Sequence, residues 1–360
     1  MIAWLLISFF VLLFLGVPIA MSLGLSAIGG ILFLGGGSTV TIAQRMFEGM
    51  NSFALLAIPL YTFAGFTMSK GGISKRLMDF CYSIVGHIYG GLAHVNVLSS
   101  MIFAGISGSA VADTAGVSGM FMPEMVRKGY SKNFTVAVTA ISSTIGIIIP
   151  PSIPMVVIAG ICGIFTGKLF LGGIIPGILC GLAQMIVSYF LAKKEGVPKE
   201  PGHFTIGPVL HGLWESWPAL LMPIIIVGTI TMGIVSPTEA GVIAVVYGLF
   251  AGGIIYRELK WEDIKFAFAE TVRTSGRIFI VIGAAKLYTV MLTTAGFDKW
   301  VAKTMLGFST NPTVILIMIL LIFFIVTMFM ESIATLTLFM PILYPIALGV
   351  GVMSMSNMAM

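Results

Sequence analysis

The chain has 360 residues, of which 58% are hydrophobic and only 9% are charged. Because a soluble domain carries roughly a quarter charged residues, this composition excludes an ordinary soluble protein. The net charge of +5 is typical of the excess of Lys and Arg in the cytoplasmic loops of membrane proteins, so we expect no binding of nucleic acid. The three cysteines have no CxxC spacing, and we expect neither a disulfide nor a metal cluster.

Continuous apolar runs predict membrane helices. They lie near residues 2–36, 52–68, 95–122, 134–149, 154–191, 218–256, 278–296 and 313–351. At about 20 residues per crossing of a lipid bilayer, the chain has room for about ten segments. The runs are continuous rather than alternating, which favours helices over a β-barrel. The sequence therefore predicts an all-α polytopic membrane protein whose first membrane helix starts near the N-terminus.

Two stretches interrupt the apolar runs. Residues 192–217 read AKKEGVPKEPGHFTIGPVLHGLWESW, with charges, prolines and two tryptophans, which predicts a polar connector at the membrane surface. Residues 256–277 predict an amphipathic interfacial helix that leads into a membrane helix. The connector divides the chain into a first half, 1–191, and a second half, 218–360.

The two halves share three sequence matches in the same order. LYT occurs at 60–62 and at 287–289, GGISKRL at 71–77 is similar to AGFDKWV at 295–301, and SGSAVADTAGVSGMFMP at 107–123 is similar to IVTMFMESIATLTLFMP at 325–341. The last match aligns Asp113 with Glu331, a shift of 218 residues. Basic residues flank the first copy on both sides, whereas none follows the second copy, so we predict inverted repeats, of which the second is incomplete.

The stretch FAGISGSAVADTAGVSGMFMP predicts a re-entrant helical hairpin over about 95–123. Small residues at 104–110 allow a tight reversal, and Asp113 and Thr114 are suited to cap the helix that follows. Helix ends at membrane depth can hold ions, since their carbonyls attract cations and their N–H groups attract anions. An acid inside a membrane segment is a functional candidate, although Asp113 could also serve only as a cap.

The stretch ISSTIGIIIPPSIP, at 141–154, predicts a broken helix over about 134–166. Pro150 and Pro151 remove two backbone donors, which would free carbonyls near residues 146 and 147. Together with the hydroxyls of residues 142–144, these carbonyls would form a set of neutral oxygens for a hard cation such as sodium. The alternative is a proline-kinked helix whose hydroxyls bond back to their own turn.

The second half offers a matching tip in MFMESIATLTLFMP, which predicts a second hairpin over about 313–345. Glu331, Ser332 and Thr335 are its candidate polar side chains. Glu239 of SPTEAG is expected to be an ordinary helix cap. The sequence contains no HExxH, Walker A or GxSxG pattern, so we expect no enzyme, no catalytic residue and no cofactor.

The chain resembles the large membrane subunit of tripartite ATP-independent periplasmic (TRAP) transporters in SSMIFAGISGSAVADTAGVSGMFMPEM, RKGYSKNFTVAVTAISSTIGIIIPPSIPMVVIAG and GIVSPTEAGVIAVVYG. The resemblance implies an elevator-type transporter of the bacterial inner membrane, belonging to the ion transporter superfamily. It also implies two partners, a small four-helix membrane subunit and a periplasmic substrate-binding protein. The implied substrate is an organic acid such as a dicarboxylate or a sialic acid, and sodium is the implied coupling ion.

The same resemblance implies which residues form the site. The first sodium site maps to Ser107, Gly108, Ser109, Asp113, Ser143, Thr144, Gly146 and Pro150. The second ion site maps to Glu331, Ser332 and Thr335, and the substrate ligands map to Thr114, Ser142 and Ser332.

The C-terminus departs from the family's pattern. Family members continue into another broken helix, whereas a shift of 218 from Ser142 reaches Met360, the last residue given. We therefore expect that the second copy of the broken helix is absent. The alternatives are a stand-alone sodium–dicarboxylate symporter or antiporter, and a truncated fragment without transport activity.

Overall fold

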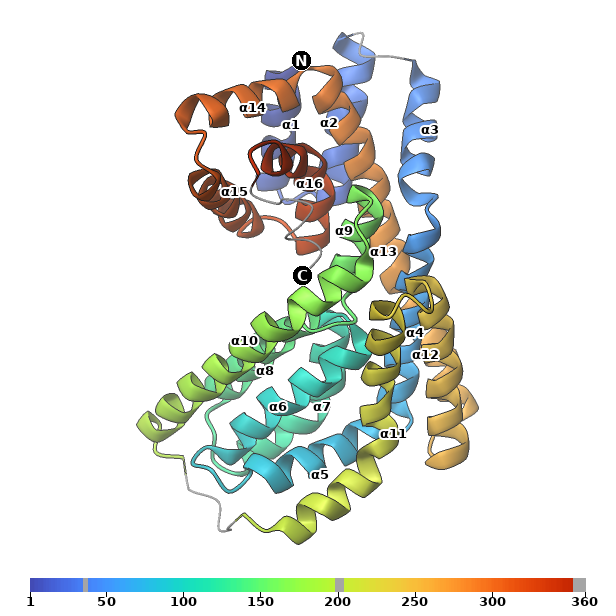
Figure 1. Cartoon of the computed structure of the whole chain (residues 1–360), viewed down its shortest axis with the longest axis vertical. Helices are drawn as coiled ribbons and strands as arrows, with labels where there is room; N and C mark the ends of the chain where they lie inside the picture. The colour runs from blue at the N-terminus through green and yellow to red at the C-terminus, as the bar shows by residue number, and fades with distance from the viewer. Residues whose placement is uncertain (35–37, 198–203, 352–360) are drawn as a thin grey trace. The chain divides into compact units, whose positions relative to one another are not determined.

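All regular structure in the part of the chain that is described, residues 1–34, 38–197 and 204–351, is helical in the computed structural model (Figure 1). This confirms the predicted all-α class. The described chain divides into two compact units, and each is treated separately below. Unit 1 comprises residues 1–55, 157–164 and those from 275 onward, and unit 2 comprises residues 56–156 and 165–274.

Unit 2 is built from helices that follow one another from α4 to α12. They are α4 (Ala57–Lys70), α5 (Ile73–Val85), α6 (Gly91–Ser107), α7 (Ala110–Arg127), α8 (Lys132–Ser143), the short η2 (Thr144–Ile147), α10 (Thr166–Lys194), α11 (Ile206–Thr231), α12 (Pro237–Phe250) and the short η3 (Ala251–Ile255). In Figure 1, α6, α7 and α8 lie side by side. A two-residue turn joins α6 to α7, so the first predicted hairpin is present as a pair of packed helices.

Unit 1 combines helices from both ends of the chain. They are α1 (Ile2–Phe14), α2 (Ile19–Leu34), α3 (Thr39–Met50), α14 (Phe297–Phe308), α15 (Pro312–Thr327) and α16 (Ser332–Gly349). Three of the four boundaries between the units fall inside η1 (Phe53–Leu56), α9 (Ile153–Cys162) and α13 (Trp261–Thr294), and the fourth lies between α9 and α10. The second predicted hairpin corresponds to α15 and α16, which also pack on each other.

Compact units and sequence repeats are different properties, so the division into residues 1–191, 192–217 and 218–360 stays a prediction. Within the predicted connector, residues 206–217 form the first turns of α11. Residues 198–203 of the connector and residues 352–360 of the second half lie outside the described part. From Trp261 onward, the predicted interfacial stretch belongs to α13, which continues without a break to Thr294.

Within the described ranges, six helices are long and apolar enough to cross a membrane: Phe53–Lys70, Thr166–Lys194, Ile206–Thr231, Pro237–Ile255, Trp261–Thr294 and Ser332–Gly349. The predicted first membrane helix is shorter than expected, because α1 has only 13 residues and ends before Gly16, which has a φ of +82°. A positive φ favours glycine and turns the chain out of the helix.

Helix starts follow the capping residues of the sequence. Ser131 accepts a hydrogen bond from the Phe134 amide at the start of α8. Before α12, the Ser236 amide donates to Glu239 Oε2 at 2.7 Å, and the Glu239 amide donates to Ser236 Oγ at 3.3 Å. This reciprocal pair is a capping box, and it confirms that Glu239 is a cap.

Small residues hold α4 against α12 in unit 2. Ala57, Ala64, Ala240 and Ala244 are at most 1% exposed in the same core. Gly241 lies on α4 so closely that an added Cβ would be 2.8 Å from the Cβ of Leu60. In lipid, helices associate through such close van der Waals packing, because water does not drive apolar surfaces together there.

The close approach of α4 and α12 predicts a large effect of a single methyl group. We expect Gly241→Ala to lower the free energy of unfolding by about 1–3 kcal/mol, because the new Cβ overpacks the interface. Gly172→Ala is the matched control, since Gly172 also lies inside a helix of unit 2 but has open space around it. Thermal unfolding in detergent measures both, and equal midpoints would contradict the expectation.

Candidate functional site

The tip of the first hairpin consists of two residues, Gly108 and Ser109. Gly108 has a φ of +63° and ends α6, and the Ser109 hydroxyl accepts a hydrogen bond from the Ala112 amide at the start of α7. The sequence had indicated Asp113 and Thr114 as the cap, and this was wrong because α7 begins earlier, at Ala110. Asp113 instead lies within the first turn, and the Thr114 hydroxyl donates to the Ala110 carbonyl at 2.8 Å.

The predicted broken helix is present, and its break lies in unit 2. It leaves α-helical geometry at Thr144, well before Pro150, and resumes at Ile153. The short η2 turn fills the beginning of this break. One of the two carbonyls expected to be free, that of Ile147, accepts a hydrogen bond of 2.7 Å from the Ser152 hydroxyl. The prolines alone therefore do not explain where the helix ends.

The hairpin tip lies directly against the break. The Ile153 amide donates to the Gly108 carbonyl at 3.1 Å, which joins the start of α9 to the tip. An added Cβ at Gly108 would collide with the Pro151 carbonyl, and one at Gly146 would collide with Asp113 Oδ2. Both glycines are thus required for close approach.

Asp113 is the most unusual side chain of this contact. It is fully buried, and the Ser107 hydroxyl donates to its Oδ1. Its Oδ2 lies over Gly146 and has no hydrogen-bond partner in the described part of the protein. Buried polar atoms are almost always paired, because leaving water without a partner is costly. A cation or a proton at Oδ2 would relieve this cost.

The three hydroxyls of α8 and η2 do not share one role. Ser142 is buried, donates to Asn96 Oδ1 at 3.0 Å and accepts from the Ser100 hydroxyl at 3.1 Å. Ser143 is also buried, but its hydroxyl donates to the carbonyl of Thr139. The exposed Thr144 bonds back to Ile141 in the same way. The local alternative therefore describes Ser143 and Thr144 well.

Sequence reasoning missed the partners of Ser142. Asn96 donates to the Thr139 hydroxyl at 2.8 Å, so a buried chain of polar groups joins α6 to α8. Spacing could have revealed it, because Asn96 and Ser100 are four residues apart on one helix face and meet Thr139 and Ser142, three apart on the other.

The second tip lies in unit 1 and differs from the first. Glu331 is the N-cap of α16, and its Oε2 accepts from the Ala334 amide at 3.3 Å. The Thr335 hydroxyl donates to the Glu331 carbonyl at 3.1 Å, and Ser332 is the first helical residue. Glu331 is exposed where Asp113 is buried. The two acids align in sequence, but they occupy different positions of their helices.

A protein-family comparison matches residues 6–358 to the DctM component of tripartite ATP-independent periplasmic transporters. The chain belongs to this family. Since the match spans nearly the whole chain, and since six described helices can cross a membrane, the protein is a multi-pass membrane protein. The resemblance read from the sequence motifs is thereby confirmed.

Several relatives are named as permease proteins of TRAP transporters. The isethionate TRAP transporter permease DctMQ of Oleidesulfovibrio alaskensis is 38% identical over 96% of this chain and 54% of its own length. The sialic acid large permease SiaM of Vibrio cholerae is 35% identical over 95% of this chain and 80% of its own. The C4-dicarboxylate large permease DctM of Pseudomonas aeruginosa is 36% identical over 92% and 77%. The chain thus spans about half of the first relative and about four fifths of the other two.

The contact between Gly146 and Asp113 can be tested in this DctM-family chain without measuring transport. We expect Gly146→Ala to lower the free energy of unfolding by about 1–3 kcal/mol through overpacking, whereas Gly119→Ala, which has open space in α7, has no such penalty. Adding Asp113→Ala to Gly146→Ala removes the colliding carboxylate, so the two effects are not additive. Additive changes in thermal stability would refute the contact.

Proposed function

We propose that the chain is the large membrane subunit of a secondary active importer in the bacterial inner membrane, which moves small organic acids together with sodium ions. In this proposal, a periplasmic binding protein delivers the acid, and a small four-helix membrane subunit completes the transporter. Family membership over residues 6–358 supports the general activity.

The relatives support the substrate class. Their names give isethionate, sialic acid and C4-dicarboxylates as substrates, all of which are small organic anions. Two of these relatives are called large permease proteins, which is consistent with a separate small partner. We extend to this chain only the feature that these substrates share, a small organic molecule with an acidic group.

The proposed coupling to sodium is supported above all by the buried Asp113 Oδ2, which has no hydrogen-bond partner among the described residues. A buried carboxylate without a matching charge is unfavourable, and a bound cation would remove most of the penalty. The Ser107 hydroxyl and the backbone around Gly108 and Gly146 supply further oxygens close by. Hard cations such as sodium prefer oxygen ligands of this kind.

The two hairpins and the broken helix support the proposed transport mechanism. Interrupted helices in corresponding parts of two repeats are typical of secondary transporters, whose sites lie near the middle of the membrane. We propose that the α6–α7 and α15–α16 pairs are re-entrant and that their tips move in an elevator-type cycle. In this proposal, Thr114, Ser332 and, on the broken helix, Ser142 lie on the substrate side.

Reconstitution tests the proposal as a whole. Proteoliposomes that contain the full chain, the small subunit and a candidate binding protein are expected to take up an organic acid only when an inward sodium gradient is present. Uptake that proceeds equally without the binding protein would instead favour a stand-alone symporter. Uptake that persists after dissipation of the sodium gradient would exclude the coupling.

Asp113→Asn tests the ion site directly. Replacing the carboxylate by an amide removes the charge but keeps the shape, so we expect the sodium concentration for half-maximal uptake to rise at least about tenfold. Glu262→Gln is the control, because Glu262 is exposed in the first turn of α13, in the same unit. A wild-type sodium dependence in Asp113→Asn would remove this residue from the site.

A further inference from the structure

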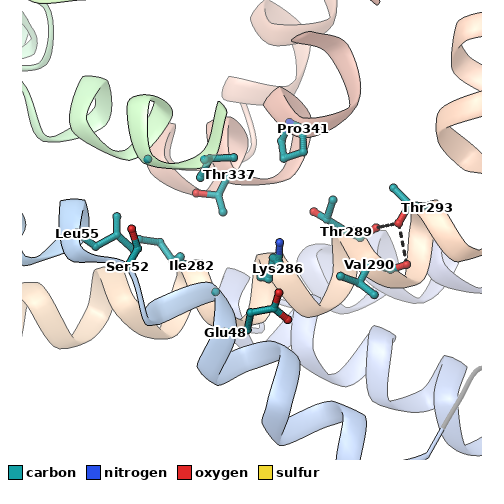
Figure 2. A pocket seen from close by; sticks show the side chains of 13 residues that line it. Glu48, Ser52, Leu55, Ile282, Lys286, Thr289, Val290, Thr293, Thr337 and Pro341 are labelled. Carbon is teal, nitrogen blue, oxygen red and sulfur yellow. Dashed lines mark hydrogen bonds between the residues drawn. The ribbon is translucent and has the colours of Figure 1, made fainter. Parts of the chain in front are cut away.

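A cavity of about 320 Å³ in unit 1 lies outside the contact that the hairpin tip makes with the helix break in unit 2. It lies among α3, α13 and α16, and the end of α9 contributes Gly160 and Ile161 (Figure 2). All of its 13 lining residues belong to unit 1. Its polar side chains are Glu48, Ser52, Lys286, Thr289, Thr293 and Thr337.

Lys286 places a positive charge in this cavity. Figure 2 shows its nitrogen on the side of the cavity that faces Thr337 and Pro341. Its stem packs on α3 at Gly49, where an added Cβ would lie 2.9 Å from the Lys286 Cγ. Lys286 is half-buried, and no carboxylate of a described residue lies within 4.0 Å of its ammonium group.

Glu48, the acid that lines the same cavity, forms a salt bridge with Arg45. Arg45 Nη1 lies 2.8 Å from Glu48 Oε2 in a salt bridge on the exposed side of α3. The hydrogen bond from Arg45, with its positive charge, lowers the pKa of Glu48 below the ordinary value. The positive charge of Lys286 also lowers the pKa of Glu48. Arg45, Glu48 and Lys286 together therefore keep one positive charge in excess at the cavity.

A buried hydroxyl stands next to this charge. Thr289 lies three residues after Lys286 on α13, so both side chains are on neighbouring positions of one helix face. Thr289 is only 6% exposed, and its hydroxyl has no hydrogen-bond partner among the residues described. An ammonium without a salt bridge and an unsatisfied buried donor in one cavity are suited to an anion with oxygen acceptors.

The repeated LYT motif shows how this arrangement differs from its counterpart. Tyr288 donates its hydroxyl to the Leu5 carbonyl at 2.8 Å, and Tyr61 donates to the Pro237 carbonyl at 2.9 Å, so the two tyrosines are placed alike. In the first motif, however, Pro59 takes the position of Lys286.

The threonines differ as well. The Thr62 hydroxyl in the first motif is satisfied by the Ile58 carbonyl at 2.7 Å, whereas the Thr289 hydroxyl in the second is not. Charge and free hydroxyl are thus confined to one of the two copies. The hydrogen bonds that the two tyrosines share do not account for this difference.

We propose that Lys286 and Thr289 bind a carboxylate group of a small organic acid in this cavity. The ligand class rests on the proposed function, whereas the anion site itself rests on the geometry of unit 1. The single positive charge in excess matches one carboxylate, and a volume of about 320 Å³ lies within the range of small-molecule sites. Lys286 supplies the charge and Thr289 a hydrogen bond. The apolar lining residues Leu55, Ile161, Ile282 and Val290 contact the rest of the organic acid.

Equilibrium binding to the purified full chain in detergent tests this site. The probes are succinate, N-acetylneuraminate, isethionate and inorganic phosphate, compared at equal sodium concentration and ionic strength. We expect saturable binding of at least one carboxylate, and Lys286→Ala should raise its Kd by about tenfold to a hundredfold. Lys286→Arg keeps the charge and should remain within about threefold of the wild type. Lys303→Ala, an exposed lysine on α14 of the same unit, is the control and should bind normally.

The outcomes separate this site from the proposed function. Wild-type affinity in Lys286→Ala, no binding of any carboxylate by the wild-type chain, or tighter binding of phosphate than of every carboxylate would overturn the assignment. If carboxylates bind through Lys286 but reconstituted uptake fails, the site stands and the proposed transport function falls. If reconstituted uptake by the wild-type chain is observed but carboxylate binding is unchanged in Lys286→Ala, the transport function stands and the site falls.

Discussion

Unit 2 depends on one constraint, the burial of a carboxylate where a hairpin tip meets a broken helix. Asp113 has no contact with solvent, and one of its oxygens is satisfied by Ser107 while the other lies over Gly146. This contact requires glycine on the broken helix, a very short turn on the hairpin, and backbone rather than side chains between them. The proposed binding of a cation at the unsatisfied oxygen would connect this local packing to the proposed transport.

Much of this arrangement can be predicted from the sequence. Continuous apolar runs with few charges predict an all-α membrane protein, and the structure contains only helices in its described residues. The small residues at 104–110 predict the reversal of the first hairpin, and Pro150 and Pro151 predict the region of the break. These predictions succeed because backbone geometry at glycine and proline is a local property. Family membership follows from the same motifs.

Other features depend on contacts between distant residues and could not be predicted in this way. The role of Gly146 is set by Asp113, which lies on another helix, so the sequence alone does not show why this position must be glycine. Glu331 aligns with Asp113 in the repeat, yet it caps α16 and is exposed. The four residues that join α15 to α16, compared with two between α6 and α7, shift the helix start relative to the aligned acids. Nothing in the local sequence distinguishes Lys286 from the other basic residues, because its place in a cavity depends on the residues of other helices.

The polar chain of Asn96, Ser100, Thr139 and Ser142 fixes how α6 lies along α8. Its three bonds between helices contribute little to stability, on the order of 0.6 kcal/mol each in a membrane protein. Their geometry is more demanding than their energy, because sliding α6 by one residue would turn these donors and acceptors away from each other. In a hydrocarbon environment no water replaces a lost partner. The first hairpin and the first part of the broken helix are therefore expected to move as a single rigid body. Any opening of the tip must then occur beyond these four polar residues, at the contact between Gly108 and Ile153.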